Sequence, residues 1–157
     1  MIRQAHVDDA EAIAKVHVAS WQVAYKGLMP DDFLANLSIE SRKTQWQQWL
    51  EQNEQAMMVC EVNNNIVGFS SAGKARDSDL NNHVAELYTL YLLLDFWGKG
   101  YGKKLYQETL KELTARGYKQ FVLWVLDSNQ RGRTFYEAMG LRPDGQHKTE
   151  TWQNGVT

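Results

Sequence analysis

Residues 90–110 read LYLLLDFWGKGYGKKLYQETL, and this stretch decides how the rest of the chain is interpreted. An apolar strand, expected over residues 85–94, runs into a loop with three glycines and then into a helix that ends near Gly117. Glycine lets the backbone turn tightly and approach a ligand closely. The first N–H groups of a helix lack internal partners, and its positive dipole end favours phosphate. The order of these elements therefore predicts an anion site.

Spacing separates the nucleotide-binding motifs that this loop could represent. A Walker loop ends in Gly-Lys-Ser/Thr, whereas Gly102 is followed by Lys103 and Lys104, so no hydroxyl is supplied for magnesium. A dinucleotide fingerprint needs Gly-x-Gly-x-x-Gly and an acidic residue about 20 positions later. The glycines here fall at every second position, and residues 119–122 read KQFV. The dinucleotide motif is kept as an alternative, which would make the chain an NAD(P)-binding oxidoreductase.

Two blocks of the sequence carry a resemblance to a known family. The segment FWGKGYGKKL resembles the pyrophosphate loop of the GNAT superfamily of N-acetyltransferases, and residues 127–145, DSNQRGRTFYEAMGLRPDG, are similar to its second block. The opening, residues 2–30, also resembles the first strand and helix of many members. Trp97 stands where the family has Gln or Arg, and Gly132 where alanine is usual. The likeness covers nearly the whole chain.

Size and composition predict one cytoplasmic domain spanning residues 1–157. The apolar content is 43% and the charged content 23%, as in ordinary globular proteins. The net charge of -2 argues against nucleic acid as a partner. No apolar run approaches the ~18 residues of a membrane span, and no signal peptide is evident. The single cysteine, Cys60, lies in an apolar run and is interpreted as a buried thiol; the histidines show no metal-ligand spacing, so no metal is expected.

The order of elements predicts an α/β (α+β) fold. Apolar periodicity indicates an edge strand at residues 1–5, a helix over residues 10–25, a short helical turn through residue 37 and a helix capped by Ser38. A hairpin over 57–62 and 66–72 is joined by three asparagines, which tolerate left-handed backbone. After a loop at 77–82, a strand is expected at residues 85–94, followed by the glycine loop and a helix that ends near Gly117. The remaining elements are expected at residues 121–126 (strand), 130–139 (helix) and, weakly, 149–152 (strand).

The resemblance implies a GNAT-like mixed, mostly antiparallel central sheet flanked by helices on both faces. Two further strands usually follow the last helix in that fold, whereas the sequence ends at Thr157. The final strand is either absent or supplied by a partner subunit, so a homodimer is an open expectation.

The resemblance also implies acetyl-CoA as the co-substrate. Backbone groups of Leu90, Tyr91 and Leu92 would bind the pantetheine arm, although the same residues could form an ordinary core strand. The pyrophosphate would be held by a run of six residues: Gly98, Lys99, Gly100, Tyr101, Gly102 and Lys103.

Asn129 and Tyr136 match the second block of the family. The asparagine would hydrogen-bond the pantetheine, or would cap the helix at residue 130. Tyr136 would act as the general acid that protonates the departing sulfur, since a phenol with a pKa of ~10 can protonate a basic thiolate held close to it. Packing beside Phe135 is the alternative role for Tyr136.

Acetyl transfer to an amine requires the amine to be neutral, which predicts a general base. Glu86 is the best candidate because it precedes the glycine loop on the strand and shares sequence parity with Leu90 and Leu92. A solvent-facing carboxylate is the alternative.

The sequence thus predicts an acetyl-CoA-dependent N-acetyltransferase in which a small-molecule or peptide amine attacks directly in a ternary complex. A noncatalytic acyl-CoA sensor or interaction module on the same fold is the alternative of a different class. Trp21, Tyr25 and residues 27–33 lie where the family places its acceptor-binding elements, although Trp21 could equally belong to the core. The sequence does not identify the acceptor.

Overall fold

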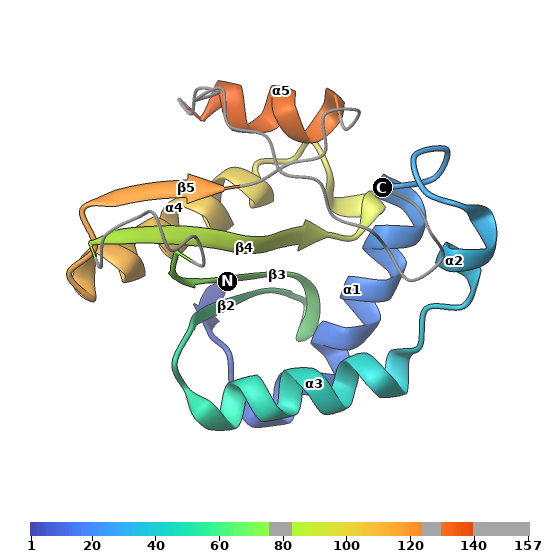
Figure 1. Cartoon of the computed structure of the whole chain (residues 1–157), viewed down its shortest axis with the longest axis horizontal. Helices are drawn as coiled ribbons and strands as arrows, with labels where there is room; N and C mark the ends of the chain where they lie inside the picture. The colour runs from blue at the N-terminus through green and yellow to red at the C-terminus, as the bar shows by residue number, and fades with distance from the viewer. Residues whose placement is uncertain (76–82, 124–129, 140–157) are drawn as a thin grey trace. The chain divides into compact units, whose positions relative to one another are not determined.

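The computed structural model describes residues 1–75, 83–123 and 130–139 (Figure 1). These residues fall into two compact units. The first unit comprises residues 1–20 and the described residues from 38 to 123, and the second comprises residues 21–37 and α5 (Gln130–Ala138). The first unit contains the sheet and the glycine loop.

A five-stranded sheet with the order β1-β2-β3-β4-β5 forms the centre of the first unit. Neighbouring strands are antiparallel except β4 and β5, which run parallel. The strands are β1 (Ile2–Gln4), β2 (Ala56–Val62), β3 (Asn65–Lys74), β4 (Val84–Leu92) and β5 (Gln120–Leu123). The predicted mixed, mostly antiparallel sheet is confirmed.

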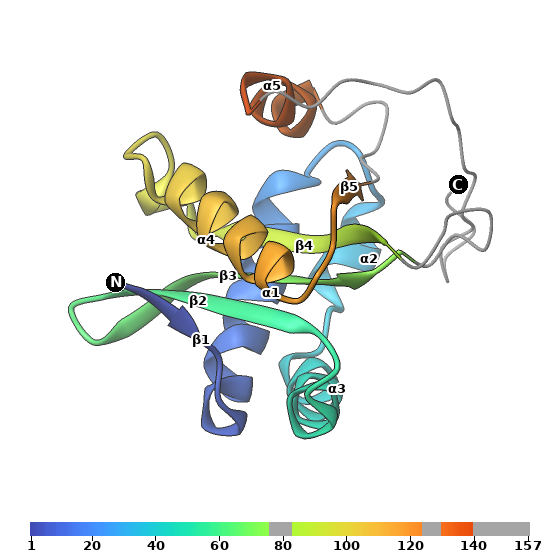
Figure 2. The same ribbon diagram turned by 90° about the vertical axis from the view of Figure 1, so that its left-hand side faces the viewer.

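Helices cover both faces of this sheet. Figure 2 shows α4 (Tyr101–Ala115) on one side, and α3 (Ile39–Gln52) with the first part of α1 (Ala10–Ala24) on the other. A 3₁₀ turn, η1 (Val7–Asp9), precedes α1, and α2 (Asp31–Ala35) lies in the second unit. The strand expected at residues 149–152 and the loop at 77–82 lie outside the described residues.

Two of these elements form where local sequence signals predicted them. Ser38 caps α3, where its hydroxyl accepts the backbone N–H of Ser41 at 3.1 Å. In the β2–β3 hairpin, Asn63 and Asn64 have φ of 52° and 67°, the left-handed region that asparagine tolerates. The turn therefore sets the register of β2 against β3.

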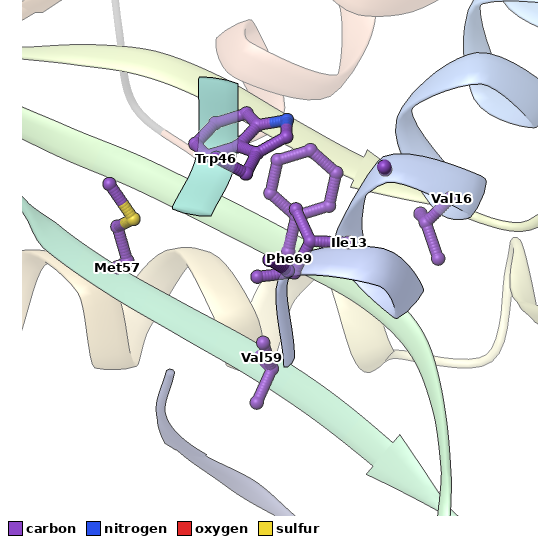
Figure 3. Close-up of a cluster of buried hydrophobic side chains, with 8 residues drawn as sticks. Ile13, Val16, Trp46, Met57, Val59 and Phe69 are labelled. Atoms are coloured by element: carbon purple, nitrogen blue, oxygen red, sulfur yellow. The ribbon is translucent and has the colours of Figure 1, made fainter. Parts of the chain in front are cut away.

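The face of the sheet beneath α1 and α3 carries the main apolar core. Ile13 and Val16 from α1 and Trp46 from α3 pack against side chains of β2 and β3, among them Val59 and Phe69 (Figure 3). Trp46 and Phe69 are each 1% exposed, and their rings meet edge to face at 5.1 Å. Burial of each large side chain in this cluster stabilises the fold by about 1.5–3 kcal/mol.

His17 lies inside this core and is neutral. Its Nδ1 accepts the indole N–H of Trp46 at 3.1 Å, and its ring stacks on Tyr91 of β4 at 5.6 Å. Burial, with the charge of Arg42 as a smaller cause, lowers the pKa of His17 from 6.5 to about 3. The ring of His17 therefore links α1 to β4.

The opposite face of the sheet is covered by α4, which contacts β1 through β4. Leu105 and Leu113 of this helix are fully buried. The Ser70 and Thr109 hydroxyls are 2.6 Å apart between β3 and α4. Cys60 is fully buried on β2, and burial raises its thiol pKa, so the expected buried strand thiol is confirmed.

Replacing His17 with a residue that cannot be protonated should reduce the loss of stability of the folded chain at acidic pH. Because its folded pKa is depressed, the unfolded chain takes up a proton below pH 6.5 that the folded chain refuses until about pH 3. As the pH is lowered through this window, the free energy of unfolding therefore decreases by up to about 1.4 kcal/mol per pH unit. His17→Gln keeps an acceptor for the Trp46 indole and should lose this slope in urea unfolding between pH 7 and 4.5.

The matched control is His6→Gln, since His6 is exposed. Asp9 does not confound the comparison. Burial opposes ionisation of its carboxyl group, but hydrogen bonds from the Arg3 side chain and from the backbone N–H of His6 lower its pKa below 3.8. Asp9 therefore stays ionised throughout the pH range of the experiment. An equal pH slope in wild type and His17→Gln would contradict the assignment of a neutral His17.

Candidate functional site

A β-bulge interrupts β4 at Tyr88. Ser71 of β3 lies opposite Thr89, but the next residue, Ala72, lies opposite Leu87, so Tyr88 is an extra residue in β4. The parallel pairing of β5 with β4 reaches its last described pair at Leu87 and Leu123. A bulge bends its strand and increases the local twist. The bend in β4 therefore coincides with the point where the described pairing to β5 stops.

Beyond the bulge, one edge of β4 has no partner strand within the described residues. We call the edge of Tyr88–Leu92 that is turned away from β3 the open edge. The Leu93 N–H donates to Val67 O at 2.9 Å, and residue pairs alternate between bonded and nonbonded along an antiparallel ladder. Leu92 and Leu90 therefore direct their N–H and C=O groups to the open edge, whereas Tyr91 directs its groups toward Phe69 in β3.

The carbonyl of Leu92 at this edge already has hydrogen-bond donors. The indole Nε1 of Trp97 donates to it at 2.9 Å, and the hydroxyl of Ser20 donates at 3.3 Å. Ser20 is a buried residue of α1, and Trp97 directly precedes the first glycine of the loop. The end of β4 is thus tied both to α1 and to the glycine loop.

The glycine loop turns the chain from η2 (Leu94–Phe96) into α4. Gly98 and Gly100 have φ of 74° and 89°, a left-handed backbone that other residues adopt only with strain. Gly100 is the N-cap and provides no side-chain cap. The N–H of Lys104 bonds to the Gly100 carbonyl, so the N–H groups of residues 101–103 precede the first helical bond. The predicted arrangement of glycines and exposed helix amides is present.

Positive charge surrounds this helix start. Lys99, Lys103 and Lys104 are all exposed. The Lys99 ammonium lies 5.8 Å from the ring centroid of Phe96, which also meets Tyr101 edge to face at 5.9 Å. Amides, a positive helix end and lysines together favour binding of a phosphate-bearing ligand.

Glu86 lies in β4 directly before the bulge, opposite Gly73 of β3 and Val122 of β5. Its side chain is 1% exposed, so it is not a solvent-facing carboxylate. The expected parity with Leu90 and Leu92 is wrong, because the extra residue at Tyr88 shifts the alternation by one. Glu86 instead shares a face with Tyr91, the face covered by α1 and α3.

The residues of the second block are placed by α5, which belongs to the second unit. Tyr136 is half-buried, and its ring packs edge to face on Phe135 at 5.2 Å. Asn129 lies outside the described residues. The predicted site residues of β4 and the glycine loop are therefore consecutive parts of one unit, and the roles of Tyr136 and Asn129 stay predictions.

The sequence analysis did not predict a place near the open edge for three residues: Trp97, Ser20 and His17. Trp97 was noted only as a departure from the family pattern, and Ser20 carries no sequence signal. The spacing of His17 along α1, with Ile13 and Ala14 on the buried face, could have placed it in the core but not against Tyr91.

The described residues also include a hollow beside the start of α4. This hollow of about 360 Å³ is lined by residues of β1, β2 and α4, including Cys60, Tyr101 and Lys104. The described part of the chain has no group of three or more His, Cys, Asp or Glu side chains that could hold a metal ion. None of its helices is both long and apolar enough for a membrane span.

A bent strand with an open edge, followed by a glycine turn and a basic helix start, defines a fold suited to a long phosphate-bearing ligand. The sequence matches the acetyltransferase (GNAT) family over residues 20–141, and the chain belongs to that family. This confirms the resemblance, the fold class, the N-acetyltransferase assignment and acetyl-CoA as co-substrate.

Comparison with individual proteins also shows similarity to N-acetyltransferases. An uncharacterized N-acetyltransferase of Archaeoglobus fulgidus is 30% identical over 142 residues, covering 90% of this chain and 92% of the relative. The uncharacterized N-acetyltransferase YuaI of Bacillus subtilis is 29% identical over 137 residues, covering 87% and 77%. Among solved structures, PaiA N-acetyltransferase from Thermoplasma acidophilum in complex with coenzyme A has a TM-score of 0.73 at 21% identity, covering 99% of this chain and 93% of that one.

The close approach of β3 to the open strand yields a structural prediction. A Cβ on Gly68 would lie 2.4 Å from Leu92 Cδ2 and 2.9 Å from the Tyr91 carbonyl oxygen, so the strand would have to shift. Gly68→Ala should lower the free energy of unfolding by about 1–3 kcal/mol in urea denaturation. Gly73→Ala is the matched control, since its Cβ would first meet only the Tyr88 hydroxyl, at 3.1 Å. Equal stability of the two variants would contradict the packing of Leu92 on Gly68.

Proposed function

We propose that this chain transfers an acetyl group from acetyl-CoA to a primary amine by direct attack in a ternary complex. The observation that carries the proposal is the open edge of β4, which leads directly into the glycine turn and the start of α4. Acetyl-CoA supplies the activated thioester. The amine forms the new N–C bond as the C–S bond breaks, and the residues of this chain orient the groups and move two protons.

The described residues fit this co-substrate. The N–H and C=O of Leu90 and the N–H of Leu92 offer a strand-like edge for the amide groups of the pantetheine arm. The N–H groups of residues 101–103, with the lysines beside them, suit the diphosphate. The backbone groups of Tyr91 point toward β3, so they do not take the pantetheine-binding role that the resemblance implied. Tyr91 instead holds the strand, because its ring is fixed against His17 and Phe69.

The proton transfers are assigned to Glu86 and Tyr136. Glu86 receives the proton of the attacking amine through a water molecule, and the phenol of Tyr136 gives a proton to the departing sulfur. A backbone N–H of the open edge near Leu92 stabilises the negative charge that develops on the acetyl oxygen. A covalent acyl-enzyme is disfavoured because Cys60, the single cysteine of the sequence, is fully buried on β2.

The acceptor is a small-molecule or peptide amine. Within the second unit, Trp21 meets Tyr25 edge to face at 4.9 Å and Phe33 at 6.4 Å. Aromatic faces attract cationic amines. In this group Trp21 is buried, whereas Tyr25 and Phe33 are half-buried, and these two rings support an amine-bearing acceptor of moderate size.

Ligand stabilisation tests the cofactor assignment. Acetyl-CoA and coenzyme A at about 100 times Kd should stabilise the folded chain by about 2.7 kcal/mol, measured as a rise in Tm, whereas NAD should have no effect. Stabilisation by NAD alone would identify a dinucleotide-binding protein instead. Thiol release from acetyl-CoA with a panel of amines then separates an enzyme from an acyl-CoA sensor, which would bind coenzyme A without turnover of any amine.

Removing the phenol of Tyr136 should slow the reaction more than it weakens cofactor binding. Tyr136→Phe keeps the edge-to-face packing on Phe135 and should lower kcat by about 10²-fold, because sulfur leaves without its proton donor. The Kd for coenzyme A should be almost unchanged in calorimetry. Tyr118→Phe, at another half-buried tyrosine, is the control, and an unaltered kcat in Tyr136→Phe would remove the acid role.

A further inference from the structure

The carbonyl of Leu92 receives donors from two separate parts of the first unit. Trp97 Nε1 reaches it at 2.9 Å from the residue that begins the glycine loop, and Ser20 Oγ reaches it at 3.3 Å from α1. Leu92 itself is buried and packs with Cys60 and Val67, and Trp97 lies against the same cluster. This carbonyl is therefore held in a fixed place at the end of the open edge.

We propose that Trp97 and Ser20 are positioning residues that fix the distance between the open edge of β4 and the glycine turn. The inference rests on the proposed function, in which one long ligand contacts both places. Trp97 is adjacent to Gly98 in sequence, yet its indole is bonded back to the strand five residues earlier. The bond closes a short loop that includes η2, so movement of the glycine turn relative to Leu92 is restricted.

The same contacts define which ligand groups the strand end accepts. With its carbonyl occupied by two side-chain donors, Leu92 offers its N–H to a ligand but has little capacity left to accept a hydrogen bond. A ligand carbonyl is thereby favoured at this position over a ligand N–H. An amide carbonyl of the pantetheine arm, which supplies an acceptor oxygen close to the diphosphate, matches this requirement.

Fixing two half-sites at the correct separation adds affinity without adding a contact. When one part of a linked ligand is bound, the effective concentration of the other part depends on the geometry between the sites. Loss of the Trp97 bond should therefore weaken a ligand that spans both half-sites and leave fragments that occupy one half-site almost unaffected. A purely structural role for Trp97 would not produce this difference.

The test compares coenzyme A with ADP and with acetyl-pantetheine in calorimetric titrations of the full chain. Trp97→Phe keeps an aromatic ring and removes the donor. Its Kd for coenzyme A should rise about tenfold, while the Kd values for ADP and acetyl-pantetheine stay within about twofold of wild type. Trp49→Phe is the matched control, because Trp49 packs on Trp46 in α3, away from the open edge, and should change none of the three affinities.

Ser20→Ala provides a second variant. It should show the same pattern with a smaller change, because its bond is longer, and the double variant should exceed the sum of the two since each single variant leaves one donor on the carbonyl. Unchanged coenzyme A affinity in Trp97→Phe, or equal weakening of all three ligands, would overturn the positioning role. Failure of wild type to bind coenzyme A would instead overturn the proposed function itself.

Discussion

The extra residue at Tyr88 is the constraint on which the rest of the site depends. The backbone N–H and C=O groups of a central strand normally form hydrogen bonds with the strands on both sides. Proteins usually cover or shorten a strand edge that has no partner, because it can pair with other chains. In β4, the bulge bends the strand where the described pairing with β5 stops, so the residues beyond it keep β3 on one side and present the open edge on the other. Within the described residues, the bend thus leaves backbone groups of a central strand without a partner strand.

The surrounding core keeps this exposed strand rigid. Tyr91 stacks on the neutral ring of His17, which is in turn bonded to Trp46, and the Leu92 carbonyl is bonded to Ser20 and Trp97. These contacts come from the later residues of α1 in the first unit and from the residue before the glycine turn. Preorganisation of this kind reduces the conformational entropy lost when a ligand binds.

Much of the fold could be predicted from the sequence, because its signals are local. Ser38 marks the start of α3, asparagines mark the hairpin, and Gly100 and Gly117 bracket α4. The predicted strand 85–94 ends earlier, at Leu92, since residues 94–96 form a 3₁₀ turn. The bulge could not be predicted, because Tyr88 resembles any strand residue and its effect depends on the register with β3. The parity error for Glu86 follows directly from that.

Residue-resolved amide hydrogen exchange with and without coenzyme A tests the central claim most directly. The account predicts that exchange slows at the N–H groups of Leu90, Leu92 and residues 101–103, which point to the open edge or precede the first bond of α4. Amides in α3, such as that of Trp46, should exchange at the same rate in both samples. Protection that is absent from the open edge and the glycine turn, or concentrated elsewhere in the sheet, would contradict the account.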